Sequence, residues 1–327
     1  MRMNNLELTL LQNLLVPSYD GDYNAIVSVI TSFLKTIPDV KIVNQPISNN
    51  KYNVIAITGK PDTLINCHTD TVPPSDGWST DPTELICQKE KLYGLGTTDT
   101  KGNIYTVLQS FAAVQPKNLM LLFSADEETG GYDSGVSYFL NSSYSNRIQT
   151  AIVCEPTELE KVNQHKAFYS FEVVFKGKDG HSSCLKNKHN AIVSAAEKIV
   201  LLHKAGFQIG KISGGNRGNV IASECTIRVS YRTYESYDRI KNVLQEIVGN
   251  KAEIYYRCKL PALKARDVLL GEVDFWTEAS LFRQEGIESY VLGAGSIKQA
   301  HQTNEYIEMN QLIKAQTVFR DLMRKYL

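Results

Sequence analysis

Short apolar runs alternate with helical patterns over the first 160 residues of this 327-residue chain, and this alternation strongly constrains its fold. The runs have the length and apolarity of buried strands. They lie at residues 54–57, 64–66, 120–123 and 151–153. Between the second and third runs, apolar residues have the spacing of one helix face: Ile104, Val107, Leu108 and Phe111. Buried strands separated by helices predict an α/β domain whose mixed, mainly parallel sheet is flanked by helices.

The pattern changes near Val162, where polar and apolar residues begin to alternate as in half-exposed antiparallel strands. Strand patterns at 167–175, 224–232 and 252–258 are separated by helical patterns at 190–203 and 237–248. This order predicts a small α+β sandwich over residues 163–262. After Pro261 the helical and strand patterns resume. The sandwich is therefore predicted to be inserted into a larger domain formed by residues 1–162 and 263–327.

Composition argues against several classes of protein. Lys plus Arg and Asp plus Glu number 35 each, so no positive field is available to hold a nucleic acid. The six cysteines form no Cys-x-x-Cys pair, which argues against a zinc knuckle or a disulfide framework. Polar residues interrupt the apolar N-terminal stretch, and no apolar run has the length of a membrane span. We expect a cytoplasmic protein with free thiols that binds neither nucleic acid nor membrane.

Acidic or histidine-bearing segments follow apolar runs at five places. In an open α/β sheet, functional side chains collect at such strand ends. The segments carry His68 with Asp70, then Asp99, the acidic residues 126–128, Glu155 and His301. Each segment alone has an ordinary interpretation: a surface histidine, a helix N-cap or a solvated acidic loop. The glycines near Asp99 match neither a dinucleotide-binding motif nor a P-loop.

Together, the five segments offer a set of ligands for two metal ions. Each ion would receive one imidazole, one terminal carboxylate and a share of a bridging carboxylate. The set is His68, Asp99, Glu128, Glu155 and His301. Nitrogen and oxygen ligands of this kind suit zinc, cobalt or manganese. Two such ions, about 3.5–4 Å apart, activate a water and polarise an amide carbonyl. The sequence therefore predicts a two-metal hydrolase.

In their order and context, these segments resemble the M20 metallopeptidase family, the aminoacylase and acetylornithine deacetylase group. The family-like motifs are His-x-Asp-x-Val-Pro from His68, Gly-x-Gly-x-x-Asp-x-Lys-Gly ending at Gly102, Glu-Glu-x-Gly, Glu-Pro and a late histidine. The resemblance covers nearly the whole chain. It implies a zinc-peptidase-like fold that binds two ions, Zn²⁺ or Co²⁺. It also implies a cis peptide between Asp99 and Thr100.

The resemblance assigns roles within the predicted centre. His68 and Glu155 would complete the shell of one ion, Glu128 and His301 that of the other, and Asp99 would bridge the two. Glu127 would be the general base, which takes a proton from the attacking water and passes it to the leaving nitrogen. Asp70 would orient the His68 imidazole.

The inserted segment carries further family-like residues. A Gly-x-x-x-His-Ser element contains His181. In related dimers this histidine reaches the partner's active site and stabilises the oxyanion. Asn219 and Arg232 are similar to family residues that hold the α-carboxylate of the substrate. Ala222 stands where the family usually has proline. The resemblance thus implies a homodimer in which residues 163–262 form a lid and dimerisation domain.

The segment from Gly293 to His301 is most similar to the acetylornithine deacetylase version of the last motif, with Ala294 in place of proline. It implies hydrolysis of Nα-acetyl-L-ornithine to ornithine and acetate, a step of arginine biosynthesis. N-acetylcitrulline deacetylase and succinyl-diaminopimelate desuccinylase share the same motifs and stay open. A dipeptidase and a non-catalytic binding protein also stay open, although no expected ligand or base is missing.

Overall fold

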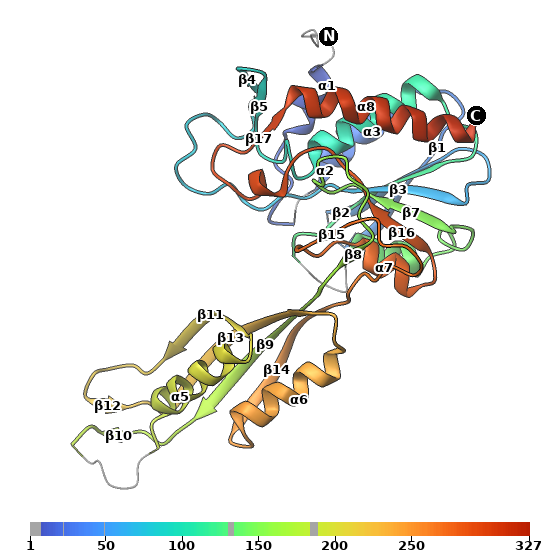
Figure 1. Cartoon of the computed structure of the whole chain (residues 1–327). Coiled ribbons are helices and arrows are strands. Elements are labelled where there is room, and N and C mark those ends of the chain that lie inside the picture. Colours follow the sequence, from blue (N-terminus) through green and yellow to red (C-terminus); the bar gives the residue numbers. More distant parts are fainter. Residues whose placement is uncertain (1–7, 22, 49, 130–133, 184–188) are drawn as a thin grey trace. The chain divides into compact units, whose positions relative to one another are not determined.

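The computed structural model describes residues 8–21, 23–48, 50–129, 134–183 and 189–327. The chain forms two compact units, Met1–His165 with Leu263–Leu327 and Lys166–Ala262, here called unit 1 and unit 2 (Figure 1). Among the described residues, no helix has the length and apolarity needed to cross a membrane. The lid and dimerisation role of residues 163–262 stays a prediction.

Unit 1 contains a six-stranded sheet with the order β1-β2-β6-β3-β7-β16. The strands are β1 (Lys41–Ser48), β2 (Lys51–Ile57), β3 (Thr63–His68), β6 (Met120–Ser124), β7 (Thr150–Val153) and β16 (Glu288–Val291). Strands β6, β3, β7 and β16 are parallel, whereas β2 is antiparallel to both β1 and β6. The predicted mixed, mainly parallel sheet is confirmed. Strand β1 was not predicted, because it is an edge strand with two polar residues and a proline, Asn44-Gln45-Pro46, at its centre.

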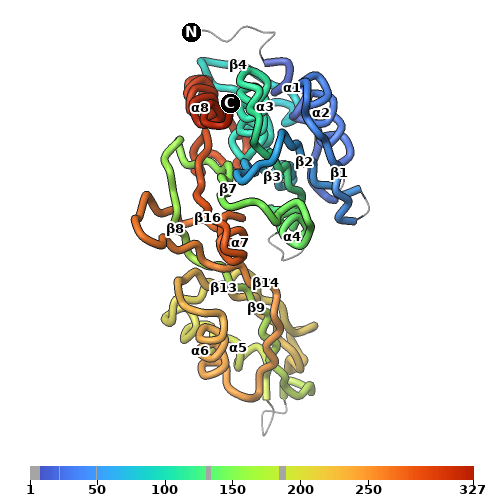
Figure 2. The backbone as a smooth tube through the Cα atoms, turned by 90° about the vertical axis from the view of Figure 1, so that its right-hand side faces the viewer, coloured from blue at the N-terminus to red at the C-terminus, as the bar shows by residue number. Residues whose placement is uncertain are grey.

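Helices cover both faces of this sheet (Figure 2). One face carries α1 (Thr9–Leu14), α2 (Asn24–Leu34), α3 (Lys101–Val114) and α8 (Met309–Met323), and the other carries α4 (Gly135–Leu140) and α7 (Ala279–Gln284). The apolar face predicted for residues 104–111 is fully buried in the core against α1, α8 and the sheet. This burial fixes the beginning of α3, and with it the position of the loop that precedes the helix.

Smaller sheets attach the later segments of unit 1. Strands β4 (Ile86–Gln88), β5 (Lys91–Tyr93) and β17 (Tyr306–Glu308) form a three-stranded antiparallel sheet. Strands β8 (Gln164–His165) and β15 (Glu272–Val273) form a parallel pair. Pairing of β17 with β5 places the segment after His301 beside the segment that leads to Asp99. Two sequence-distant candidates are thereby brought to one region.

Unit 2 is a four-stranded antiparallel sheet with two helices packed on one face. The strands, in the order β11-β13-β9-β14, are β9 (Ala167–Lys176), β11 (Gln208–Gly214), β13 (Glu224–Thr233) and β14 (Ala252–Leu260), and the helices are α5 (Ala191–Lys204) and α6 (Tyr237–Val248). Strand β11 was not predicted. It is an exposed edge strand with two glycines, so its sequence lacks the alternation that marks a half-buried strand.

Candidate metal centre

The candidate ligands of unit 1 collect at the carboxyl ends of neighbouring strands. His68 is the last residue of β3, Glu128 follows β6, and Glu155 follows β7. Because β6, β3 and β7 are adjacent and parallel, their carboxyl ends meet at one edge of the sheet. Asp99 reaches the same edge from the loop before α3, and His301 from the loop after β16.

The segment that leads to His301 reaches this edge because the main chain at Gly293 packs closely against the main chain at Glu155. A Cβ atom on Gly293 would lie 2.4 Å from the carbonyl oxygen of Glu155, so no larger residue fits there. The Asn103 side chain holds the next residue, because its Oδ1 accepts the N–H of Ala294 and its Nδ2 donates to the Ala294 carbonyl. The segment that leads to His301 is therefore fixed against both β7 and α3.

Asp99 lies between the two candidate histidines. Its Oδ1 is 2.9 Å from His68 Nε2, and its Oδ2 is 3.4 Å from His301 Nε2. His68 Nε2 is also 3.7 Å from Glu155 Oε1, and His301 Nε2 is 2.9 Å from Glu128 Oε1. Each imidazole thus faces one oxygen of Asp99 and one further carboxylate. The peptide between Asp99 and Thr100 is cis, as the family resemblance implied.

All five candidate ligands are therefore brought together. Ligand atoms of His68, Asp99 and Glu155 lie within 4.8 Å of one another, and so do those of Asp99, Glu128 and His301. The two groups share Asp99. This is the arrangement expected of two cation sites joined by one bridging carboxylate.

The charges of this region also fit cations. Asp70, Asp99, Glu127, Glu128 and Glu155 place five carboxyl groups beside two imidazoles. Like charges this close repel one another unless positive charge lies between them. Nitrogen and oxygen donors in this number suit divalent ions of the zinc and cobalt type. The residues present therefore fit two divalent metal ions.

Asp70 contacts the centre in two ways. Its main-chain carbonyl lies 3.0 Å from His68 Nδ1, whereas its carboxylate Oδ1 is 3.6 Å from the same nitrogen. The carboxylate instead accepts the main-chain N–H groups of Glu127, at 3.2 Å, and Glu128, at 2.8 Å. Asp70 is therefore placed both to orient His68, through its carbonyl, and to fix the loop of the candidate base.

The loop after β6 also contains Asp126, to which the sequence analysis assigned no role of its own. Asp126 has a φ of +70°, which is the left-handed region, and its side chain is buried. Its Oδ1 accepts the Tyr23 hydroxyl at 3.1 Å, and its Oδ2 accepts Lys51 Nζ at 2.6 Å. These contacts hold the main chain directly before Glu127. Gly130, the last residue of the Glu-Glu-x-Gly motif, lies outside the described residues.

Burial and neighbouring charges shift the pKa values of the acidic and histidine side chains of this centre. Desolvation raises the pKa of Glu127 well above its ordinary value, and the charges of Glu128 and Glu278 add to this rise. Hydrogen bonds raise the pKa of His301 to about 10, and the bond with Asp99 contributes more than the bond with Glu128. Desolvation opposes charge on Asp99, yet its contacts with both histidines lower its pKa below the ordinary range. The metal-free site therefore favours protonated imidazoles around an ionised Asp99.

The remaining candidates lie in unit 2, and the structure brings only two of them together. Strands β10 (Gly180–His181) and β12 (Val220–Ile221) pair, with His181 opposite Val220, and the N–H of Ser182 donates to the Asn219 carbonyl at 3.0 Å. His181 and Asn219 are thus neighbours. Strands β10 and β12 lie beyond the end of the four-stranded sheet, where Lys176 pairs with Glu224 (Figure 1).

Arg232 lies at the other end of β13, opposite Phe168. Its guanidinium stacks over the Phe168 ring, 4.8 Å from the centroid. Eight residues of extended strand separate this position from Glu224, which is a distance of about 26 Å. One unit 2 cannot supply both Asn219 and Arg232 to the same small carboxylate. The predicted joint role of these two residues therefore requires two copies of the chain.

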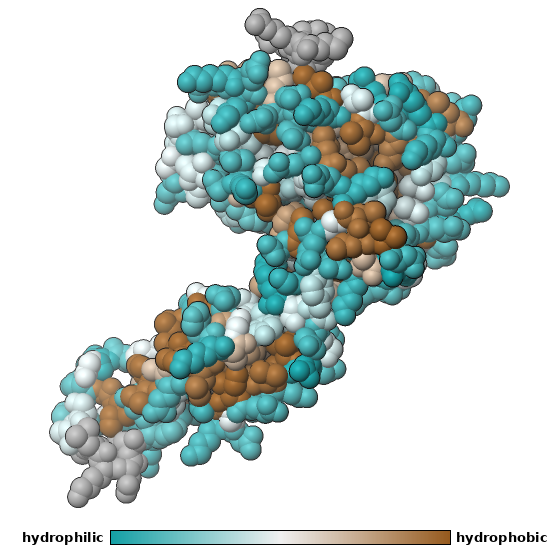
Figure 3. All heavy atoms as spheres, viewed as in Figure 1, coloured by the Kyte–Doolittle hydropathy of each residue, from teal (hydrophilic) through white to brown (hydrophobic). Residues whose placement is uncertain are grey.

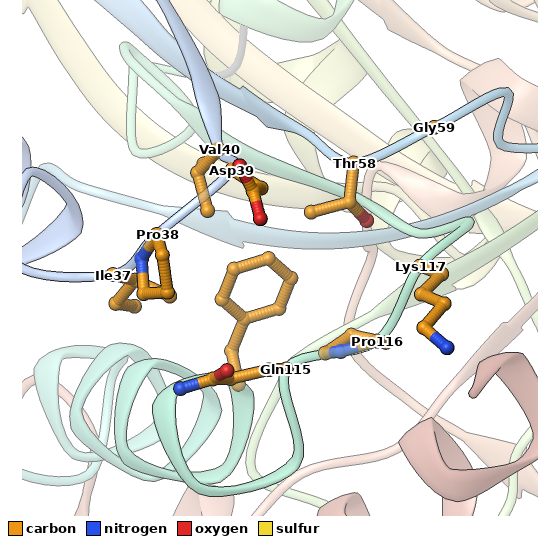
Figure 4. Close-up of a pocket in the computed structure, with 10 residues that line it drawn as sticks. Ile37, Pro38, Asp39, Val40, Thr58, Gly59, Gln115, Pro116 and Lys117 are labelled. Atoms are coloured by element: carbon orange, nitrogen blue, oxygen red, sulfur yellow. The ribbon is translucent and has the colours of Figure 1, made fainter.

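A pocket of about 210 Å³ lies at the opposite end of the unit 1 sheet (Figure 4). Its walls include Val40 before β1, Thr58 after β2 and Phe111 of α3. Ile57 pairs with Met120, so this is the edge at which the parallel strands begin. None of the candidate ligands lines this pocket. The candidate metal ligands lie at the other edge of the sheet.

Comparison with known families agrees with this geometry. Residues 64–325 match peptidase family M20/M25/M40. The chain belongs to this family. It is accordingly a metal-dependent amide hydrolase, and the match includes all five candidate ligands.

Curated relatives of this M20 chain include several deacetylases. An acetylornithine deacetylase from Pectobacterium carotovorum is 34% identical, over 82% of each chain. Another from Erwinia tasmaniensis is 33% identical, again over 82% of each chain. An N-acetyl-L-citrulline deacetylase from Xanthomonas campestris is 30% identical, over 80% of this chain and 81% of the relative.

Solved structures show that the fold is that of M20 peptidases. A tripeptidase from Staphylococcus aureus superimposes with a TM-score of 0.81 over 99% of both chains, at 19% identity. A dinuclear metal-binding peptidase of the M20 family from Bacillus subtilis gives a TM-score of 0.75 over 98% of both chains, at 16% identity. At these identities the likeness establishes the fold alone.

Proposed function

We propose that this chain hydrolyses Nα-acetyl-L-ornithine to ornithine and acetate with the help of two divalent ions, Zn²⁺ or Co²⁺. The observation that carries the proposal is the position of Asp99, whose two carboxylate oxygens face two different imidazoles. His68 and Glu155 would hold one ion, and Glu128 and His301 the other, with Asp99 as the shared ligand.

The chain's own residues would then perform the proton transfers. When bound, the two ions supply Lewis acidity to the acyl carbonyl and to the attacking water. Glu127 accepts the proton of that water and delivers it to the nitrogen of the leaving amino acid. Its raised pKa suits this role, because a base that must later act as an acid works best when its pKa approaches the operating pH. Asp70 holds the Glu127 main chain, and Tyr23 and Lys51 hold Asp126, the residue before it.

The substrate is supported by two observations. The deacetylases from Pectobacterium and Erwinia are each at least 33% identical to this chain over most of its length. The Gly293-Ala294-Gly295-Ser296-Ile297 segment leads to His301 at the metal centre, so the most distinctive sequence similarity lies where a substrate would bind. N-acetyl-L-citrulline is the second candidate substrate, because the Xanthomonas deacetylase is 30% identical. With the acetylornithine substrate, the enzyme would act in the cytoplasm in arginine biosynthesis.

A homodimer completes the proposal. Glu224 and Arg232 stand about 26 Å apart along β13, and Asn219 belongs to the segment before Glu224, beyond that end of the strand. A substrate carboxylate that meets both Asn219 and Arg232 would therefore take them from different subunits. His181 accompanies Asn219, so it would also come from the partner subunit and stabilise the oxyanion.

Unit 2 offers a surface for such a partner (Figure 3). Strand β11 is an edge strand whose outer main-chain groups are available for pairing. Large apolar side chains are exposed on β11 and on α5: Ile212, Ile192, Val193, Val200 and Leu201. An unpaired edge beside exposed apolar side chains is typical of an interface between subunits.

The deciding experiment compares kcat/KM for three substrates on protein loaded with zinc or cobalt: Nα-acetyl-L-ornithine, N-acetyl-L-citrulline and succinyl-diaminopimelate. We expect acetylornithine to be preferred and a chelator to abolish the activity. Preference for another of the three would replace the substrate and leave the metal chemistry in place. No cleavage of any of them by protein that has bound two ions would refute the deacylase proposal.

A further inference from the structure

Glu305 is a buried carboxylate with no role in the proposed proton transfers. It follows His301 by four residues, and it is only 2% exposed. Burial of a carboxylate is unfavourable unless hydrogen bonds compensate for the lost water. Its Oε1 accepts the main-chain N–H groups of Thr98, at 2.7 Å, and Asp99, at 3.0 Å. Its Oε2 accepts the N–H of Gly96 at 2.8 Å.

Other hydrogen bonds attach the same two segments to each other. The N–H of Gly94 donates to the Glu305 carbonyl at 3.1 Å, and the Thr98 hydroxyl donates to the Tyr306 carbonyl at 2.7 Å. Tyr306 also pairs with Tyr93 in the sheet of β5 and β17. The loop that ends at Asp99 is therefore joined to the segment after His301 through Glu305 and Tyr306, and the Glu305 carboxylate makes the contact with the Asp99 main chain.

We propose that Glu305 is a positioning residue that sets the place of the bridging Asp99 carboxylate relative to His301. The inference rests on the proposed two-metal function. Glu305 holds the main-chain nitrogen of Asp99, while the Asp99 Oδ2 faces His301 Nε2 at 3.4 Å. His301 and Glu305 belong to one short segment, so the contacts form a closed ring from Asp99 through Glu305 and His301 back to Asp99. A bridging ligand must keep its distance to both ions, and this ring fixes that distance on the His301 side.

The geometry requires a carboxylate at this position. Three N–H donors converge on two oxygens, and both oxygens are used. A glutamine has one acceptor oxygen and one NH₂ group, so at least one donor of the loop would face another donor. A buried N–H without an acceptor is unfavourable, and the loop would relax away from it. That relaxation would displace Asp99, which is why we expect the metal centre to respond to Glu305→Gln.

The test compares Glu305→Gln with the matched control Glu308→Gln, which makes the same change on an exposed side chain of the same segment. Co²⁺ binding would be followed by absorption spectroscopy, and kcat and KM would be measured with Nα-acetyl-L-ornithine. For Glu305→Gln we expect Co²⁺ affinity and kcat to fall about 10- to 100-fold while KM changes little. For Glu308→Gln we expect wild-type values. Wild-type Co²⁺ affinity and kcat in Glu305→Gln would overturn the positioning role.

Thermal unfolding separates positioning from general stability. A residue that only stabilises the fold would lower the Tm of metal-free and metal-loaded protein equally. A positioning residue reduces the rise in Tm that Co²⁺ produces, because that rise depends on affinity for the folded state. If Glu305→Gln folds poorly, Glu305→Asp keeps the charge with a shorter reach, and we expect an intermediate loss of the Co²⁺-induced rise. An undiminished rise in Glu305→Asp would contradict the inference. Wild-type protein that binds fewer than two ions would overturn the proposed function as well.

Discussion

The metal centre of unit 1 and the candidate residues of unit 2 are built in different ways. In unit 1, three adjacent parallel strands deliver ligands to one edge, and two loops carry Asp99 and His301 to the same place. In unit 2, an antiparallel sheet places His181 with Asn219 at one end and Arg232 at the other. One chain thus supplies a full set of metal ligands, whereas its substrate-binding candidates are divided over a long strand.

This difference separates two parts of the proposed reaction. The groups that would bind metal and transfer protons come from one unit of one chain. In the proposed homodimer, the groups that would hold the substrate and the oxyanion come from two copies of the chain. Variants in unit 1 should therefore impair each subunit independently, and variants at His181 should impair the active site of the neighbouring subunit.

The largest expected effect distinguishes the roles of two adjacent glutamates of unit 1, Glu127 and Glu128. Glu127→Gln should bind two ions but lose about 10²- to 10⁴-fold in kcat, since it lacks the general base. Glu128→Gln should instead lose metal, because Glu128 lies 2.9 Å from His301 in the second ligand group. Metal content and kcat of both variants provide the measurement. Near-normal turnover by Glu127→Gln would show that this residue is not the base.

The next effect tests whether unit 2 acts across a dimer. His181→Ala should lower kcat about 10²- to 10³-fold through loss of oxyanion stabilisation. Coexpression of His181→Ala with Glu127→Gln should restore about a quarter of wild-type activity, because half of the dimers are mixed and each has one intact site. Activity of the coexpressed pair, with the mass from light scattering, is the measurement. If the coexpressed pair is no more active than either variant alone, or if a monomer is fully active, His181 does not act in the active site of a partner subunit.

The smallest effect concerns the pH dependence of metal binding in unit 1. His301 has a pKa raised to about 10 in the metal-free protein, so its imidazole keeps its proton at neutral pH. A metal ion must displace that proton, and apparent affinity should therefore rise about tenfold per pH unit for each proton released. We expect the rise to continue from pH 6 to pH 8 in zinc competition experiments. A plateau above pH 7 would mean that the histidines are already neutral there.

The sequence allowed much of the chemistry of unit 1 to be predicted because three of the five ligands lie at or just after the end of an apolar run. A run that ends in a polar residue indicates both the strand and the edge at which the side chain lies. His68, Glu128 and Glu155 are placed in this way, and the sheet order confirms that their strands are neighbours. The cis peptide after Asp99 was likewise expected from the family resemblance.

Other features could not be predicted, because they depend on contacts between distant segments. Glu305 follows no apolar run, and its importance comes from the three N–H groups that surround it. Asp126 resembles its acidic neighbours in sequence, and only its partners Tyr23 and Lys51 distinguish it. The separation of Asn219 from Arg232, by contrast, follows from the length of β13, a strand that the pattern at 224–232 did predict.

Asp70 has a consequence for how such a site can change during evolution. Its carbonyl contacts the imidazole of His68, and its carboxylate holds the main chain of both Glu127 and Glu128. A substitution here would keep the carbonyl but remove the carboxylate, and so release the main chain of the candidate base and of a candidate metal ligand in a single event. A homologue that no longer catalyses the reaction can lose Glu127 alone and still bind its metal ions. Loss of Asp70 would also disturb Glu128, and with it metal binding. Among homologues, Asp70 should therefore persist in members that have already exchanged the base.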